Sequence, residues 1–181
     1  MRKRAPKRFV ADFETTTDPA DCRVWAWAAC PVEAPERVVY GQDVAGFLEW
    51  LEVMGDTEVW FHNLGFDVSF IFDHMLRGGK WSYDEKETGE PWTFSAVISD
   101  MNQIYSADLY FEESHARILD SLKVLPMPVR AVAKAFGLDE GKGELDYSAF
   151  RPVGHVLTEE ERDYIRRDVQ IVAKAMAKLF R

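Results

Sequence analysis

The chain is organised around one stretch, Phe9-Val10-Ala11-Asp12-Phe13-Glu14-Thr15-Thr16-Thr17, in which an apolar run ends at two carboxylates two positions apart. On a strand, this spacing places Asp12 and Glu14 on one face and Phe13 on the other. Neighbouring carboxylates repel each other unless a cation lies between them, and hard cations such as Mg²⁺ prefer oxygen ligands. The pair is therefore either solvated surface charge or part of a metal site, and the pattern alone favours surface charge.

Length and composition indicate one globular domain. The chain has 181 residues, of which 47% are hydrophobic and 13% aromatic, and this argues against disorder. No apolar run approaches the roughly 20 residues that span a bilayer, and residues 1–8 lack the apolar segment of a signal peptide. We therefore expect a cytoplasmic protein without a membrane partner. Cys22 and Cys30 have no CxxC spacing, which makes a zinc site or a disulfide framework unexpected.

The net charge of -9 has the wrong sign for a protein that holds duplex nucleic acid through its phosphates alone. The exception is the start of the chain, where five of the first eight residues are Lys or Arg. We interpret residues 1–8 as a solvated basic tail, with a phosphate contact as the alternative.

The hydrophobic pattern predicts an α/β fold with a mixed central sheet flanked by helices. Strands are expected at residues 9–13, 24–29, 37–40, 58–61, 93–98, 103–109 and 117–122. The first three are predicted to form an antiparallel meander. Four helices are expected. The first runs from the cap at Asp43 to Gly55, the second from about Asp67 to Arg77, the third over residues 129–136, and the fourth from the capping-box pattern at Thr158 to the end. Residues 80–91 are expected to form a hairpin or mobile loop, and 139–153 a long connection of the kind that often carries function.

Further acids recur at the ends of predicted elements. Asp67 lies at a strand-to-helix junction, and Tyr164 and Asp168 lie one turn apart on one face of the last helix. Two divalent ions about 3.5–4 Å apart need several shared carboxylates. With Asp12 and Glu14, the chain offers four carboxylates and a phenol that can orient water beside such ions.

Several segments of the chain resemble a known family. Three of them are similar to the exonuclease motifs of family B DNA polymerases, in the class with four acids and a tyrosine: Asp12-Phe13-Glu14-Thr15, His62-Asn63-Leu64-Gly65-Phe66-Asp67 and Tyr164-Ile165-Arg166-Arg167-Asp168. Four more resemble the protein-primed polymerases of small linear-genome bacteriophages: Asp21-Cys22-Arg23-Val24-Trp25-Ala26, Asp120-Ser121-Leu122-Lys123, Gly141-Lys142-Gly143-Glu144-Leu145-Asp146-Tyr147 and Arg151-Pro152-Val153-Gly154. The likeness covers nearly the whole chain.

This resemblance implies a ribonuclease-H-like fold and a single 3′–5′ exonuclease domain over residues 1–181. Such a domain proofreads by releasing nucleoside monophosphates from single-stranded DNA 3′ ends. The implied cofactors are two divalent ions, Mg²⁺ or Mn²⁺, and their implied ligands are Asp12, Glu14, Asp67 and Asp168. By the same resemblance Tyr164 positions the attacking water and Lys142 stabilises charge on the scissile phosphate.

The family's ligands for single-stranded DNA correspond to Thr15, His62, Asn63, Phe66, Phe70, Ser121 and Leu122. Aromatic rings give sequence-tolerant stacking faces, and small polar side chains hydrogen-bond a terminal sugar or phosphate. Structural interpretations remain open beside this one. Phe66 and Phe70 have the spacing of core residues on a helix, His62 can be a hydrogen-bonded histidine, and Lys142 can be a solvated loop charge.

The chain departs from the family at its end. It stops at Arg181, where the polymerase domain of the family begins, and it has no second carboxylate set. We therefore expect the polymerase domain to be absent and predict no nucleotide addition. The expected partners are a single-stranded DNA 3′ end and either a polymerase domain or a terminal protein. The alternatives are an exonuclease of the same fold that prefers RNA and a module that binds a single strand or a partner without cutting.

Overall fold

The sheet is built around strand β1 (Lys7–Thr15), in a computed structural model that describes residues 5–139 and 144–180. The other strands in those residues are β2 (Val24–Pro31), β3 (Val39–Gly41), β4 (Thr57–Phe61), β5 (Ser82–Tyr83), β6 (Thr93–Ile98), β7 (Ile104–Tyr110) and β8 (His115–Asp120). They form one sheet in the order β3-β2-β1-β4-β8-β7-β6-β5. The neighbours β1 and β4, β4 and β8, and β5 and β6 are parallel, and the other pairs are antiparallel.

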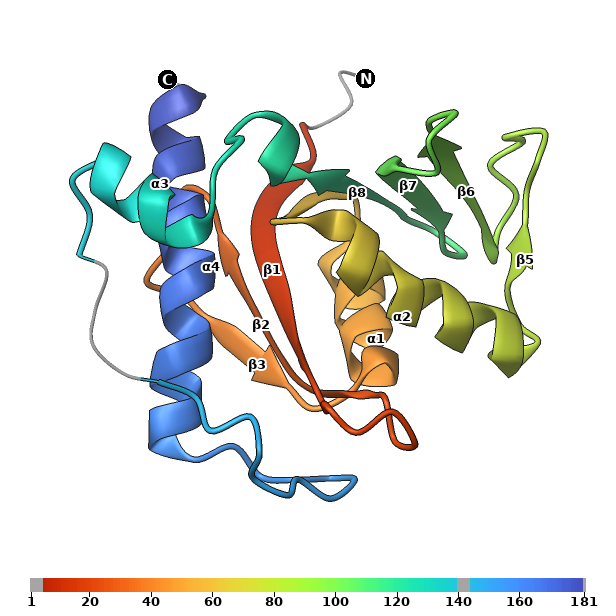
Figure 1. The fold of residues 1–181 in the computed structure, drawn as a ribbon. Helices are drawn as coiled ribbons and strands as arrows, with labels where there is room; N and C mark the ends of the chain where they lie inside the picture. Colours follow the sequence, from red (N-terminus) through yellow and green to blue (C-terminus); the bar gives the residue numbers. More distant parts are fainter. Residues whose placement is uncertain (1–4, 140–143, 181) are drawn as a thin grey trace.

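Helices cover both faces of this mixed sheet (Figure 1). In the described residues they are α1 (Val44–Met54), α2 (Leu64–Gly78), α3 (Val129–Ala135), α4 (Glu159–Leu179) and a 3₁₀ turn, η1 (Ser121–Lys123). In Figure 1, α4 runs along β1, β2 and β3, whereas β6 and β5 extend away from it. None of the described helices is long and apolar enough to cross a membrane.

The helix ends follow from local side-chain chemistry. The carboxylate of Asp43 accepts a hydrogen bond from the N–H of Gly46 at the start of α1. At the other end, Gly55 has φ 79°, a conformation that glycine adopts without strain. At the start of α4, Thr158 and Glu161 form a complete capping box. These local signals confirm the helix starts that the sequence predicts.

The core has two parts because β1 is buried on both faces. Phe9, Ala11 and Phe13 pack on the side of α1 and α2, in one apolar cluster. Val10 packs on the other side, in a second cluster with Val169 of α4. The side chains of Asp12 and Glu14 alternate with Phe13, so they share the face of Val10 and point toward α4.

The architecture confirms the predicted α/β class with its mixed sheet, including the antiparallel meander of β1, β2 and β3. The predicted end of the basic tail at residue 8 is wrong, because β1 already begins at Lys7. Lys7 and Arg8 belong to β1, where the Lys7 ammonium donates to the carbonyl of Met54 and the Arg8 guanidinium lies 4.4 Å from the ring centre of Phe180. These two cations are therefore structural.

Two other segments correct the expected pattern. Residues 80–91 form no hairpin, since β5 within them pairs in parallel with β6. The strand expected at 117–122 ends at Asp120, because the Asp120 carboxylate accepts from the N–H of Leu122 and turns the chain into η1. Ser121 and Leu122 therefore lie on a 3₁₀ turn at the edge of the sheet.

Replacing Phe47 with alanine is expected to lower the free energy of unfolding by about 3–5 kcal/mol. Its ring on α1 is fully buried and meets Phe13 and Phe61 edge to face, with centroids 5.0 and 5.7 Å apart. Val53→Ala is the control, because Val53 lies on the same helix and is 78% exposed, and its effect should stay within about 0.5 kcal/mol. Urea unfolding measures both variants. Equal losses would contradict this assignment of the core.

Candidate active site

Three parallel strands place the candidate residues at one edge of the sheet. In β1, β4 and β8 the chain runs in the same direction, so all three end at the same side. His62 and Asn63 follow β4, and Ser121 and Leu122 follow β8. Loops at the carboxyl ends of parallel strands are the usual place for a ligand site in α/β folds. The topology thus brings together segments that are far apart in sequence.

The four predicted acids converge at this edge. Asp12 and Glu14 lie on the last half of β1, Asp67 lies in the first turn of α2, and Asp168 lies on α4. Glu14 and Asp67 are buried, at 7% and 4% exposure, whereas Asp12 and Asp168 are half-buried. The acids are near enough that the charges of Asp67, Glu14 and Asp168 all act on Asp12.

Burial raises the pKa of each acid, and the charges of neighbouring carboxylates add to it for Asp12, Glu14 and Asp67. For Asp12 burial is the largest cause, followed by the charges of Asp67, Glu14 and Asp168, and the pKa lies well above its ordinary value. Burial and the charge of Asp168 raise the pKa of Glu14 to about 7, although the Arg151 cation opposes this.

Burial is also the largest cause for the other two acids. Burial raises the pKa of Asp67 to about 8, with hydrogen bonds from the N–H groups of Phe13 and of Asp67 itself partly offsetting it. Burial also raises the pKa of Asp168, against the charges of Arg167 and His62. Several carboxylates are thus held close together in a place where ionisation is unfavourable without added positive charge.

The chemistry of this donor set fits hard divalent cations, which bind carboxylate oxygens and offset this kind of repulsion. Within residues 5–139 and 144–180, however, no three His, Cys, Asp or Glu side chains are arranged as a metal-holding group. The acids are brought together, and their assignment as metal ligands stays a prediction.

A small cavity opens beside two of the acids. It has a volume of about 180 Å³ and lies between β1, α4 and the start of α3. Its polar lining consists of Asp12, His62 and Asp168, and the rest of its wall is apolar. The acids of β1 and α4 therefore border one space.

His62 is held by two hydrogen bonds, as the structural interpretation of the sequence anticipates. Its Nε2 lies 2.8 Å from the carbonyl oxygen of Met127 and donates to it, and its Nδ1 lies 3.0 Å from the hydroxyl of Ser121. That hydroxyl also lies 3.1 Å from the carbonyl oxygen of Phe61. Ser121 is fully buried, so its side chain supports His62.

Asp120 joins the loops after β4 and β8. Its Oδ1 accepts from the N–H of Asn63 at 3.1 Å and from the N–H of Leu122 at 2.9 Å. Asn63 itself has φ 72°, in the left-handed region that asparagine tolerates, and its side chain is exposed. The motif Asp120-Ser121-Leu122-Lys123 by itself assigns Asp120 no role. Its position between two loops depends on the pairing of β4 with β8.

Phe66 is not a core residue, although its helical spacing allowed that interpretation. It is 52% exposed, and its ring meets the half-buried ring of Phe70 edge to face with centroids 5.4 Å apart. Thr15 and Leu122 are half-buried at the ends of β1 and β8. The start of α2 thus carries one exposed ring, Phe66, and one half-buried ring, Phe70, which packs against the apolar core.

Tyr164 meets a second tyrosine that the sequence reasoning did not assign to the site. The hydroxyls of Tyr164 and Tyr147 lie 3.0 Å apart, and the rings are nearly perpendicular. Burial raises the pKa of both phenols, and for Tyr147 the hydrogen bond adds to this effect. Tyr147 belongs to the long connection 139–153, where no local pattern predicts a partner on α4. The other predicted residue of that connection, Lys142, lies outside the described residues.

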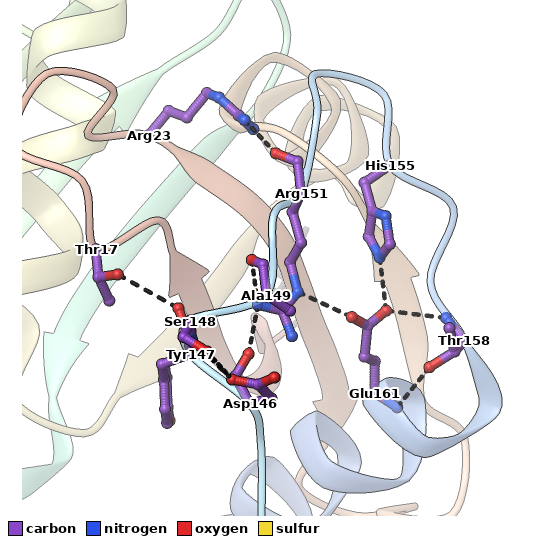
Figure 2. A network of polar contacts seen from close by, with 10 residues as sticks. All are labelled: Thr17, Arg23, Asp146, Tyr147, Ser148, Ala149, Arg151, His155, Thr158 and Glu161. Atoms are coloured by element: carbon purple, nitrogen blue, oxygen red, sulfur yellow. Dashed lines mark hydrogen bonds and ion pairs between the residues drawn. The ribbon is translucent and has the colours of Figure 1, made fainter.

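A buried ion pair ties the Tyr147 segment to α4 (Figure 2). The Arg151 guanidinium donates to Glu161 at 2.9 Å and to the carbonyl oxygen of Asp146 at 2.8 Å. The other oxygen of Glu161 lies 2.7 Å from His155 Nε2 and 3.0 Å from the N–H of Thr158. The loop is therefore closed onto the first turn of α4 at several points.

Comparison with known proteins gives consistent matches. Residues 55–157 match the family model described as DNA polymerase type B, organellar and viral. The DNA polymerase of Bacillus phage B103 is 42% identical over 177 residues, covering 94% of this chain and 30% of that protein. The DNA polymerase of Bacillus phage phi29 is 41% identical over 188 residues, covering 100% of this chain and 32% of that protein.

Solved structures give the same result. Phi29 DNA polymerase complexed with single-stranded DNA superposes with a TM-score of 0.87 at 37% identity, over 97% of this chain and 31% of that one. The ternary complex of phi29 DNA polymerase with primer-template DNA and incoming nucleotide gives a TM-score of 0.88 at 37% identity, over 98% and 31%. The chain thus spans about a third of the length of these relatives.

Glu161→Gln is expected to lower the free energy of unfolding at pH 7 by about 3 kcal/mol, because it leaves Arg151 buried without its anion. Burial acts to raise the pKa of Glu161, but hydrogen bonds from Thr158, His155 and Arg151 outweigh it and lower the pKa. The stabilisation is therefore complete above the ordinary carboxyl pKa of 4.5 and is lost as the pH falls through the lower folded pKa.

Urea unfolding at several pH values measures this difference. The gap between the wild type and Glu161→Gln should narrow as the pH falls below about 4.5. Glu160→Gln, in the same helical turn but exposed, is the control and should change stability by less than about 0.5 kcal/mol. Equal stabilities of the two variants at pH 7 would show that the ion pair contributes nothing.

Proposed function

The chain belongs to the type B DNA polymerases of organelles and viruses, and we propose that it is the metal-dependent 3′–5′ exonuclease of such an enzyme. In this proposal it releases nucleoside monophosphates from single-stranded DNA 3′ ends. The observation that carries the proposal is the convergence of Asp12, Glu14, Asp67 and Asp168 beside Tyr164, at the edge where three parallel strands end.

The acids are proposed to hold two divalent ions, Mg²⁺ or Mn²⁺. Asp12 and Glu14 approach from β1 and Asp168 from α4, with Asp67 acting directly or through water. When bound, such ions lower the pKa of water and stabilise negative charge on a reacting phosphate. The raised pKa values of the acids support this role, because a cation among them restores the ionised forms.

The phenol of Tyr164 is proposed to orient the attacking water. It stands one helical turn before Asp168, with Tyr147 as its hydrogen-bond partner. If Tyr147 donates to Tyr164, the Tyr164 hydroxyl keeps its own proton available for a water molecule. Both phenols are protonated near neutral pH, because the ordinary phenol pKa of 10.0 already lies well above it and burial raises it further.

The substrate is proposed to be a single strand held by stacking and hydrogen bonds. The exposed ring of Phe66 and the half-buried ring of Phe70 offer aromatic surface on which any base can stack. Thr15, Asn63 and Leu122 lie around the same edge, where His62 is fixed by Ser121. This binding mode suits a chain of net charge -9, because stacking depends little on phosphate neutralisation. Lys142 is proposed to stabilise charge on the scissile phosphate.

The biological setting is proposed from the relatives. They are DNA polymerases of which this chain matches about a third, and one of them is described in complex with single-stranded DNA. We infer that residues 1–181 act as a proofreading domain, with a polymerase domain or a terminal protein as partner.

Asp12→Ala with Glu14→Ala is expected to abolish metal-dependent cleavage and leave the fold intact, because it removes two of the proposed metal ligands. The assay uses a 5′-labelled single-stranded DNA with Mg²⁺ or with EDTA, resolved on a denaturing gel. The wild type should give a ladder that shortens from the 3′ end only with Mg²⁺. The control Glu49→Ala with Glu52→Ala removes two exposed carboxylates of α1 and should cut like the wild type.

The other outcomes separate the alternatives. Full activity of the double variant Asp12→Ala, Glu14→Ala would exclude these two acids as metal ligands. Faster cleavage of a matched RNA would favour the RNA-preferring enzyme. Binding of the single strand in EDTA without any product in Mg²⁺ or Mn²⁺ would favour a module that binds and does not cut.

Tyr147→Phe is expected to lower the rate of cleavage about tenfold, because Tyr164 loses a hydrogen bond of about 1.4 kcal/mol that fixes its hydroxyl. Single-turnover cleavage rates measure this effect. Affinity for the single strand in EDTA should stay within about twofold, since a phenyl ring retains the apolar surface. Tyr83→Phe, on the exposed strand β5, is the matched control and should leave the rate unchanged. An unchanged rate in Tyr147→Phe would remove Tyr147 from the site.

A further inference from the structure

Arg151 is a buried cation that has no role in the proposed chemistry beyond the effect of its charge on Glu14. Its residue surface is only 6% exposed, and its guanidinium carbon lies 4.1 Å from the centre of the Trp25 ring. Long cationic side chains are rarely buried to this degree unless they are fully paired. Arg151 begins the family-like segment Arg151-Pro152-Val153-Gly154, which supplies none of the proposed metal or DNA ligands.

The guanidinium contacts both sides of the Tyr147 turn. Its Nη1 donates to the carbonyl oxygen of Asp146 at 2.8 Å and lies 3.3 Å from that of Ala149. These two carbonyls bracket Tyr147 and Ser148. Inside the turn, the Asp146 carboxylate accepts from the N–H of Ser148 at 2.9 Å and from its hydroxyl at 2.6 Å. The turn is thus shaped by its own hydrogen bonds and attached to the rest of the protein through Arg151 and through a 3.3 Å hydrogen bond from the Thr17 hydroxyl to the carbonyl oxygen of Tyr147.

The other contact of Arg151 leads to the helix that carries Tyr164. Its Nε donates to Glu161, which lies three residues before Tyr164 on α4. Residues three apart on a helix lie on the same side, one turn from each other. Arg151 therefore fixes the turn that carries Tyr147 relative to the helical turn that carries Tyr164, and Figure 2 shows the carboxylate of Glu161 between Arg151 and His155.

We propose that Arg151 is a positioning residue of the exonuclease, which holds the Tyr147 hydroxyl against that of Tyr164 by tying the 146–149 turn to the first turn of α4. The proposal rests on the proposed function. Arg151 acts without touching DNA, so its loss lowers the rate of cleavage and leaves strand binding intact. Lysine cannot replace it, because one ammonium group lacks the planar fork that reaches a carboxylate and two carbonyls at once.

The test is a double-mutant cycle with Arg151→Lys and Tyr147→Phe. Arg151→Lys should lower the single-turnover rate about tenfold and change the affinity for single-stranded DNA in EDTA by less than about twofold. In the Tyr147→Phe background the same substitution should cost less than about twofold, because the hydroxyl that Arg151 positions is already gone. If Arg151→Lys lowers the rate as much in the Tyr147→Phe background as in the wild type, the two effects are independent and the proposal is overturned.

Arg162→Lys is the matched control. Arg162 is also an arginine near an aromatic ring, 5.8 Å from the ring centre of Tyr40, but it is exposed and lies at the start of α4 beside Glu161. It should leave the rate unchanged in both backgrounds. If Arg151→Lys does not fold, as judged by circular dichroism, Glu161→Gln replaces it in the cycle with the same expected coupling.

Hydrogen exchange supplies a readout that does not depend on activity. Amides of residues 146–150 should exchange at least about tenfold faster in Arg151→Lys than in the wild type, while those of β1 and β4 stay protected. Unchanged exchange in the turn would overturn the proposal even if the rate falls. If the wild type does not cut, the exonuclease function and the positioning role both fail. If the wild type cuts and Arg151→Lys cuts equally well, only the positioning role fails.

Discussion

Parallel pairing of β1 with β4 and of β4 with β8 is the constraint on which the rest of the structure depends. Because the three strands run in the same direction, Glu14, His62 and Ser121 reach the same edge of the sheet from positions far apart in sequence. Asp120 then joins two of the emerging loops through the N–H groups of Asn63 and Leu122. The candidate site is thus built on strand ends, which hold their positions better than free loops do.

The same arrangement works against stability at one place. β1 is buried on both faces, so Asp12 and Glu14 lie among apolar side chains and close to each other. Burial and repulsion raise the pKa of Asp12, Glu14 and Asp67, which means that the folded state disfavours their ionised forms. Groups of acids with raised pKa values are typical of functional sites, where they are kept for their chemistry. In the proposed exonuclease, bound divalent ions would offset this cost.

The loop between α3 and α4 is held in place without regular secondary structure. It carries Tyr147 to Tyr164 although it contains no helix or strand over residues 144–157. A buried pair, Arg151 with Glu161, holds it through side-chain hydrogen bonds in place of a backbone ladder. Breaking such a pair on one side is costly, because the remaining charge stays buried. The ion pair therefore fixes the loop near the contact between Tyr147 and Tyr164.

The sequence by itself determined most of the helices and strands and identified the acids, but not the pairing of β5 or the end of β8. Alternation in β1, the cap at Asp43 and the capping box at Thr158 are local, so propensity and spacing predict them, and the family motifs located Asp12, Glu14, Asp67 and Asp168. Only the tertiary structure decided that Phe66 is exposed, that Asp120 links two loops, and that Tyr147 and Arg151 meet α4. The physical reason is that strand pairing and a buried ion pair join residues distant in sequence, and no local pattern records which partners they find.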